Sequence, residues 1–204
     1  MSTHAKKTLA LAVVVFGVLA FSSTLAHALW YAPEDMTAIN PPPAKIVHNK
    51  ASPGDQPARL SIPALTIDAS VQEVGINAKG NMGIPSNYQD VAWYKYGTTP
   101  GEFGSAVIDG HVDNGLGLDG VFKHLGDIKI GDDVFVETQK GERLHFVVID
   151  IESYPYTATP DDVIFNKADA AYLNLITCEG KWVKSDKTYD ERLVVYTALV
   201  TDQS

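Results

Sequence analysis

Apolar and polar residues alternate along most of the chain from residue 59 onward, which is the pattern of short, half-buried strands. Residues 59–63 and 66–71 follow it clearly, with a Pro-Ala turn between them. Helical periodicity is sparse and is confined to residues 120–125 and 160–165. Many short strands at near-regular spacing, separated by turn residues, predict a closed barrel or a sandwich. The further strand candidates are residues 105–109, 133–138, 143–151, 171–178 and 192–200.

The N-terminal part of the chain has a different pattern, a long run without acidic residues. Lys6 and Lys7 precede an apolar stretch that reaches Tyr31, and no Asp or Glu occurs before Glu34. This length is enough to cross a hydrocarbon layer of about 30 Å, and the flanking lysines predict that the N-terminus stays inside the cell. We therefore expect a cytoplasmic tail (1–7) and a transmembrane anchor or signal segment (8–31).

Two interpretations of that segment stay open, because Ala26-His27-Ala28 also fits the pattern that precedes a signal-peptide cleavage site. Either one places the rest of the chain outside the cytoplasmic membrane. Residues 32–57 are rich in proline and poor in large apolar side chains, which is typical of an extended spacer, although an arm wrapped on the domain is the alternative. Residues 58–204 would then form one globular domain.

The net charge of the chain limits the classes of molecule that it is expected to bind. The net charge is −9, with 16 basic and 25 acidic residues, so a nucleic-acid partner is not expected, because phosphate binding requires a clustered basic surface. Arginine is scarce and occurs only at Arg59, Arg143 and Arg192.

The chain contains a single cysteine, Cys178, so an intramolecular disulfide is impossible. A lone thiol in an exported domain is either buried as a small apolar side chain or used chemically. Strand alternation over residues 173–178 places Asn174 and Ile176 on the same face as Cys178. The cysteine then stands at the end of a rigid strand, before Gly180, which we expect to break the strand. Such a position suits a nucleophile.

A cysteine nucleophile needs a proton partner, and His111 is the best placed of the six histidines. It follows Gly110 directly at the end of the predicted strand 105–109, although a purely structural role remains an alternative. The other histidines lie in the export segment (His4, His27), the spacer (His48), a helix surface (His124) and a solvated strand face (His145).

Arg192 begins the strand that follows the cysteine strand. A connection of about a dozen residues can join the two strands as an antiparallel pair, which would bring Arg192 close to Cys178. The alternative is a surface ion pair with Asp190 or Glu191.

This ordered set resembles the sortase family, whose signature is a glycine-histidine pair, a TLxTC-like cysteine strand and a downstream arginine. Gly110-His111, Leu175-Ile176-Thr177-Cys178 and Arg192 match it, while Asn174 replaces the first threonine of the signature. The resemblance is strongest to class F and related single-domain members and covers about residues 58–200. It implies an eight-stranded β-barrel, in agreement with the strand pattern. Further matching stretches are Trp93-Tyr94, Pro100-Gly101-Glu102, residues 104–113, Val121-Phe122 and Gly131-Asp132.

The resemblance also implies a reaction, in which the Cys178 sulfur attacks a backbone carbonyl in a C-terminal sorting motif of an exported protein. A thioacyl-enzyme forms, and an amine on the cell wall or on another protein resolves it. His111 would serve as general acid and base, and Arg192 would face the developing oxyanion. Thr177 is left out because alternation directs its hydroxyl to the other strand face. No cofactor and no metal are expected, since the acidic residues lack the spacing of an EF-hand.

Several alternatives remain at this stage. Water could replace the amine, which would make the protein mainly a peptide hydrolase, or the domain could be an inactive tethered binding module of the same fold. An L,D-transpeptidase is disfavoured because its cysteine belongs to a Ser/Thr-His-Gly-Cys cluster, which is not found here. Asp109 and Asp113 either orient His111 or solvate a loop, and Trp182 is expected in a loop, 179–190, beside the site.

Overall fold

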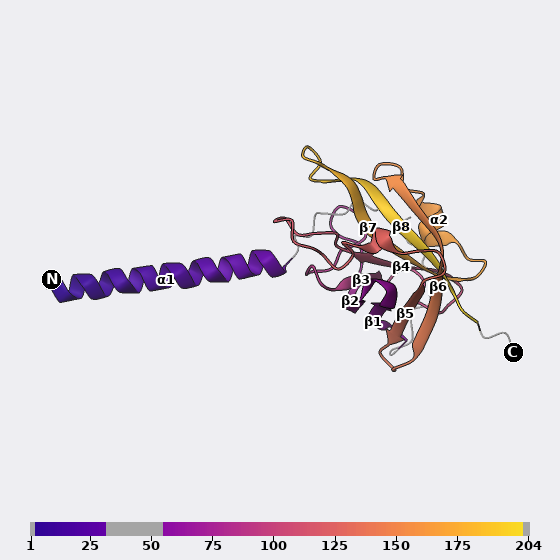
Figure 1. The fold of residues 1–204 in the computed structure, drawn as a ribbon, viewed down its shortest axis with the longest axis horizontal. Coiled ribbons are helices and arrows are strands. Elements are labelled where there is room, and N and C mark those ends of the chain that lie inside the picture. Colours follow the sequence, from indigo (N-terminus) through magenta and orange to yellow (C-terminus); the bar gives the residue numbers. More distant parts are fainter. Residues whose placement is uncertain (1–2, 32–54, 202–204) are drawn as a thin grey trace.

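The computed structural model describes residues 3–31 and 55–201 and contains a long N-terminal helix followed by a barrel of eight strands (Figure 1). Most of the predicted spacer, 32–57, lies outside the described residues. The helices are α1 (Thr3–Trp30), α2 (Asp161–Asn166) and the 3-10 turns Pro63–Leu65 and Leu125–Asp127. The strands are β1 (Pro57–Ile62), β2 (Ile67–Val74), β3 (Val91–Tyr94), β4 (Gly104–Gly110), β5 (Asp133–Thr138), β6 (Arg143–Pro155), β7 (Ala171–Val183) and β8 (Thr188–Leu199).

The strands close into one barrel in the order β1-β2-β3-β4-β7-β8-β6-β5, with β5 returning to β1. The predicted barrel is therefore confirmed. Two neighbouring pairs, β2 with β3 and β4 with β7, run parallel, and the others run antiparallel. The parallel pair β4–β7 brings together two segments that are more than sixty residues apart in the sequence. The predicted site residues His111 and Cys178 belong to these two segments.

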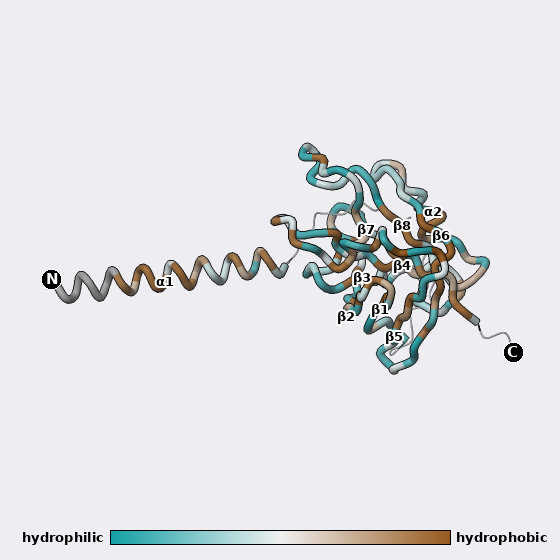
Figure 2. Tube along the Cα trace, in the orientation of Figure 1, coloured by the Kyte–Doolittle hydropathy of each residue, from teal (hydrophilic) through white to brown (hydrophobic). Residues whose placement is uncertain are grey.

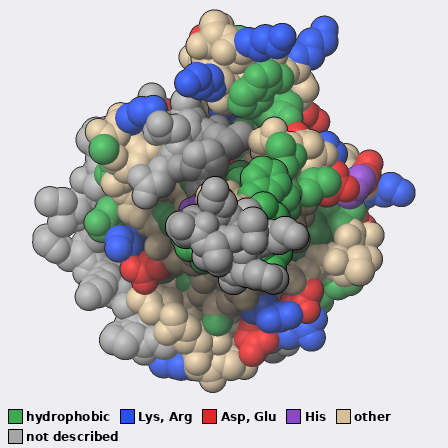
Figure 3. Space-filling view, turned by 90° about the vertical axis from the view of Figure 1, so that its left-hand side faces the viewer, with side chains coloured by type: hydrophobic (Ala, Val, Ile, Leu, Met, Phe, Trp, Pro, Cys, Tyr) green, Lys and Arg blue, Asp and Glu red, His purple; other side chains and the backbone are tan. Residues whose placement is uncertain are grey.

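Three local predictions need correction. The sequence pattern missed β3, and it placed a helix at 120–125 where the chain forms turns that lead into the 3-10 turn Leu125–Asp127. The expected loop 179–190 is a β-hairpin instead, because β7 continues to Val183 and β8 already begins at Thr188. Lys181, Lys184 and Lys187 are exposed on this hairpin, and lysine side chains gather at its projecting end (Figure 3).

The two faces of the sheet carry two separate cores. Alternate residues point into the barrel, where Leu173 and Leu175 of β7 meet Ile108 of β4 and other fully buried apolar side chains. The intervening residues point outward. On the outer face of β3, β4, β7 and β8 they form a second cluster with Ile164 and Phe165 of α2. The catalytic candidates belong to this outer face.

The helix α1 extends away from the barrel, and most of its coloured part is hydrophobic, with some polar positions (Figures 1 and 2). Its segment Leu11–Trp30 has a mean hydropathy of 2.0 and no buried residues, so it fits a membrane span by length and composition. A helix buried in a protein core is inconsistent with this exposure.

Candidate active site

Cys178 lies in the outer-face row of β7, directly opposite Arg192 of β8 in the antiparallel register. Its side chain is 8% exposed. The strand does not end at Gly180 as expected but passes through an irregularity between Glu179 and Trp182. Gly180 has a φ of +83°, and an added Cβ would lie 2.1 Å from a carboxylate oxygen of Asp190, so the glycine is required for a close approach within the hairpin.

His111 follows the last residue of β4, at the end of the parallel β4–β7 pair. The register pairs Asp109 with Ile176, and its continuation leads His111 toward Cys178. The Thr177 hydroxyl fixes this junction by donating a buried hydrogen bond of 2.8 Å to the Gly110 carbonyl. Thr177 thus faces away from Cys178 and links the strand of the nucleophile to the strand of the histidine.

The surroundings of the His111 ring determine which nitrogen can exchange a proton. The ring is 5% exposed, its Nε2 lies 3.1 Å from the Pro85 carbonyl oxygen, and the Tyr88 ring centre is 5.1 Å away. A carbonyl oxygen only accepts, so Nε2 carries the hydrogen, and Nδ1 is the basic nitrogen of the neutral ring. Burial lowers the pKa of His111, while the Pro85 carbonyl and the Asp113 charge oppose this shift.

Arg192 is fully buried, with 0% exposure, and its side chain is held by its own strand. One terminal nitrogen, Nη1, donates to the carbonyls of Tyr189 (3.0 Å) and Glu191 (2.8 Å), and Nη2 donates to the Thr188 hydroxyl (2.8 Å). The guanidinium also lies 5.7 Å from the centre of the Tyr156 ring. Nε has no partner among the described residues, so a donor remains available on a rigidly positioned cation.

The charge state of the cysteine–histidine pair follows from burial. Desolvation raises the pKa of Cys178 to about 11; the Arg192 charge opposes this shift, whereas Asp109 and Asp113 reinforce it. The pKa of His111 is lowered at the same time. Both changes favour the neutral forms, thiol and imidazole, over thiolate and imidazolium.

The two aspartates predicted to act near His111, Asp109 and Asp113, differ in their surroundings. Asp113 accepts a hydrogen bond from the Tyr189 hydroxyl, and its charge favours the protonated form of His111. Asp109 is 2% exposed and lies on the strand itself, so it does not solvate a loop. The recorded hydrogen bond of the His111 ring goes to the Pro85 carbonyl, and neither aspartate is its partner.

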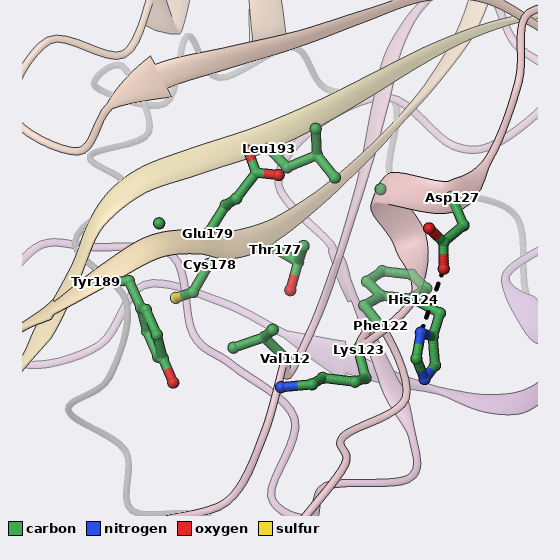
Figure 4. Close-up of a pocket in the computed structure, with 12 residues that line it drawn as sticks. Val112, Phe122, Lys123, His124, Asp127, Thr177, Cys178, Glu179, Tyr189 and Leu193 are labelled. Carbon is green, nitrogen blue, oxygen red and sulfur yellow. Dashed lines mark hydrogen bonds and ion pairs between the residues drawn. The ribbon is translucent and has the colours of Figure 1, made fainter. Parts of the chain in front are cut away.

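A cleft of about 260 Å³ opens beside Cys178 (Figure 4). Tyr189 stands next to the sulfur in this view, and Lys123 and His124 lie across the cleft. Trp182, expected to shape the site from a loop, is a strand residue that packs edge-to-face on Tyr189, with ring centres 5.4 Å apart.

Sequence reasoning missed Tyr189. A correct β7–β8 hairpin register was the signal that could have placed it beside Cys178 and Arg192. His124 and His145 lie on the surface beside Asp127 and Asp133.

Metal binding was not expected. In the part of the chain that the structure describes, no group of three His, Cys, Asp or Glu side chains could hold a metal ion. The absence of a required metal or cofactor stays a prediction.

The family model described as Sortase domain matches residues 60–200. No curated protein matched. Sortase C-1 from Actinomyces oris is 21% identical, with a TM-score of 0.56 over 89% of this chain and 96% of that chain.

Two further solved structures have the same fold. The lid mutant of sortase A from Corynebacterium diphtheriae is 22% identical, with a TM-score of 0.54 over 71% of this chain and 70% of that chain. Sortase C from Clostridium perfringens, solved with the C-terminal cell wall sorting motif, is 21% identical, with a TM-score of 0.53 over 72% of each chain. The resemblance to class F stays a prediction.

Proposed function

The chain belongs to the sortase family of transpeptidases, and on that premise we propose that it cleaves a C-terminal sorting motif of exported proteins and transfers the acyl part to an amine. The observation that carries the proposal is the direct pairing of Cys178 with Arg192 across β7 and β8, at the end where β4 leads into His111. A nucleophile, a base and a fixed cation on neighbouring strands are the components that acyl transfer requires.

The first half of the reaction begins from the neutral pair. His111 takes the thiol proton at Nδ1 as the Cys178 sulfur attacks the scissile carbonyl carbon, and a tetrahedral oxyanion forms. Arg192 stabilises the oxyanion through Nε–H and the remaining Nη2 hydrogen, since its other three hydrogens are bonded to the chain. The imidazolium then protonates the leaving amine, the C–N bond breaks, and a thioester remains on Cys178.

The second half reverses these roles. His111 removes a proton from the incoming amine, which attacks the thioester carbonyl, and Arg192 again faces the oxyanion. The C–S bond breaks, the new amide leaves, and the Cys178 sulfur recovers its proton from the imidazolium.

The location of the domain is part of the proposal. Lys6 and Lys7 precede the apolar span Leu11–Trp30, so the N-terminus would be inside and the barrel outside the cell membrane. Cleavage after the Ala26-His27-Ala28 motif would release the same domain as a secreted protein.

The test is mass spectrometry of the full chain in detergent with a library of motif peptides, with and without amine donors. We expect a thioacyl adduct on Cys178 and an amide product when the amine is present. Cys178→Ala should lose both, with an unchanged circular dichroism spectrum. Release of only the free acid would make the protein a hydrolase, and absence of any adduct would favour a binding module.

A further inference from the structure

Two large leucine side chains are held in solvent by residues 113–119, here called the leucine loop, which follow His111. Leu116 is 63% exposed and Leu118 is 55% exposed. The backbone of the loop is nevertheless fixed, because the buried Asn114 side chain accepts hydrogen bonds of 2.9 Å from the N–H groups of both leucines. Isolated exposed apolar residues are common, but a braced loop that presents two of them indicates an interaction surface.

The β7–β8 hairpin adds a third large side chain beside the leucine loop. Trp182 is 44% exposed and packs edge-to-face on Tyr189, whose hydroxyl donates a hydrogen bond to Asp113 at the start of the loop. The hairpin and the loop are therefore connected to each other. Both also adjoin the candidate active site, since the loop follows His111 and Tyr189 lines the cleft at Cys178.

The end of the apolar helix α1 lies on the same side of the barrel. Tyr31, directly after α1, forms an isolated antiparallel bridge with Asn87. Two residues farther on, the Gln89 side chain donates a hydrogen bond of 3.3 Å to the Asp119 carbonyl of the leucine loop. The hairpin and the loop project from the side of the barrel on which α1 extends (Figure 1), and hydrophobic side chains are exposed on this side (Figure 3).

This position of α1 indicates what the exposed side chains contact. Leu11–Trp30 fits a membrane span, so its end would lie at the outer interface of the bilayer, together with the segment that pairs with Tyr31. Tryptophan is enriched at such interfaces, and leucine side chains are buried favourably in them. The exposed lysines of the hairpin suit the phosphates of lipid headgroups, because two neighbouring acids, Asp186 and Asp190, already accept hydrogen bonds within the chain.

We propose that the leucine loop and the Trp182 side of the hairpin rest on the outer surface of the lipid bilayer, beside the Cys178 cleft. The inference rests on the proposed transpeptidase function and membrane anchor, and it adds the place where the substrate is met. The scissile bond of an exported protein would be presented at the bilayer surface. Another possible occupant of an apolar surface is a second copy of the chain, and the experiment separates the two.

The experiment uses the full chain in lipid nanodiscs, one copy per disc, and measures quenching of Trp182 fluorescence by brominated acyl chains. Every protein carries Trp30→Phe, so that the anchor gives no signal, and Trp93 is buried in the barrel. The Trp182 signal is the difference between this protein and one that also carries Trp182→Phe. Discs of phosphatidylcholine and phosphatidylglycerol are compared with and without bromine in the acyl chains.

The comparison adds a double variant, Leu116→Ser with Leu118→Ser, and a matched control, Phe103→Ser. Phe103 is 78% exposed but stands before the first residue of β4, at the end of the strand opposite His111. Brominated lipid should reduce the Trp182 signal about twofold in the parent protein and in the control, because an interfacial side chain lies within reach of the acyl chains. The double variant should lose most of this quenching.

A Trp182 signal that brominated lipid leaves unchanged, or equal quenching in the double variant, would overturn the inference. A signal that responds only when discs hold two copies would assign the surface to self-association instead. These outcomes leave thioacyl formation on Cys178 in place. Failure of the full chain to enter the discs would refute the membrane anchor and the inference with it, whereas absence of any adduct with motif peptides would refute the proposed reaction.

Discussion

The buried carboxylate of Asp109 gives a quantitative prediction for stability against pH. Burial raises the pKa of Asp109 from 3.8 to about 7, and the charges and dipoles near Arg192 and Gly110 oppose this shift only in part. A raised pKa in the folded state means that folding favours the protonated acid. Its stabilising contribution is therefore complete below pH 3.8 and is lost as the pH rises through 7.

The free energy of folding that is lost follows from the size of the Asp109 pKa shift. About three pKa units at 1.36 kcal/mol each correspond to about 4 kcal/mol, a large part of the stability of an ordinary domain. Asp109→Asn replaces the acid by a group of similar shape that does not titrate. Relative to wild type, we expect this variant to gain up to about 4 kcal/mol in unfolding free energy between pH 4 and pH 8.

The assay is urea unfolding of the full chain in detergent, followed by tryptophan fluorescence at several pH values from 4 to 9; Trp93 is buried and reports on the barrel. The quantity of interest is the difference between variant and wild type, in which the titration of other groups cancels. Asp132→Asn removes a carboxylate from the turn before β5 and serves as the control for the loss of one negative charge. A flat difference for Asp109→Asn would refute the reasoning and would mean that its carboxyl is solvated or paired in solution.

Three further predictions concern the site itself. Thr177→Val removes the buried hydrogen bond to Gly110 and should lower the unfolding free energy by about 1–3 kcal/mol and slow thioacylation, while Thr177→Ser should retain both; equal stability of the two variants in urea would contradict this. Tyr189→Phe releases the Asp113 carboxylate, whose charge then acts more strongly on His111, so the limb of the pH–rate profile assigned to His111 should move to higher pH; an unmoved limb would exclude this link. Alkylation of Cys178 by iodoacetamide should still be accelerating at pH 10, because burial raises the pKa of the thiol to about 11; a plateau near pH 9 would disprove the assignment.

Alternation predicts β1, β2, β5 and β6, in which buried residues are interspersed with more exposed ones, whereas β4, β7 and β8 are recognisable as longer apolar runs. The missed strand, β3, has only four residues, all of them buried, so it offers neither alternation nor a run of sufficient length. The hairpin was misread for another reason. Gly180 resembles a strand breaker, but it is there because Asp190 approaches closely and accepts the Lys181 N–H at 2.5 Å.

The sequence predicts which residues form the candidate site, and that stays a prediction, whereas the electrostatics of the site could not be predicted. Residue type and order along the chain indicated His111, Cys178 and Arg192, and register brings the latter two opposite each other. Burial, however, depends on what packs over a residue, so neither the high pKa of Cys178 nor the buried carboxylate of Asp109 can be read from local sequence. The roles of Thr177 and of Tyr189 likewise depend on partners far away in the chain.

The place of β8 in the barrel has a consequence for biosynthesis. It is the last strand along the chain, yet it lies between β7 and β6 and carries Arg192. Contacts between distant segments form late in folding, and a chain made from its N-terminus delivers this strand after all the others. In a partly delivered chain, Arg192, the cation proposed to face the oxyanion, would be missing from the site. On the proposed mechanism, efficient acylation would therefore wait until β8 has been inserted.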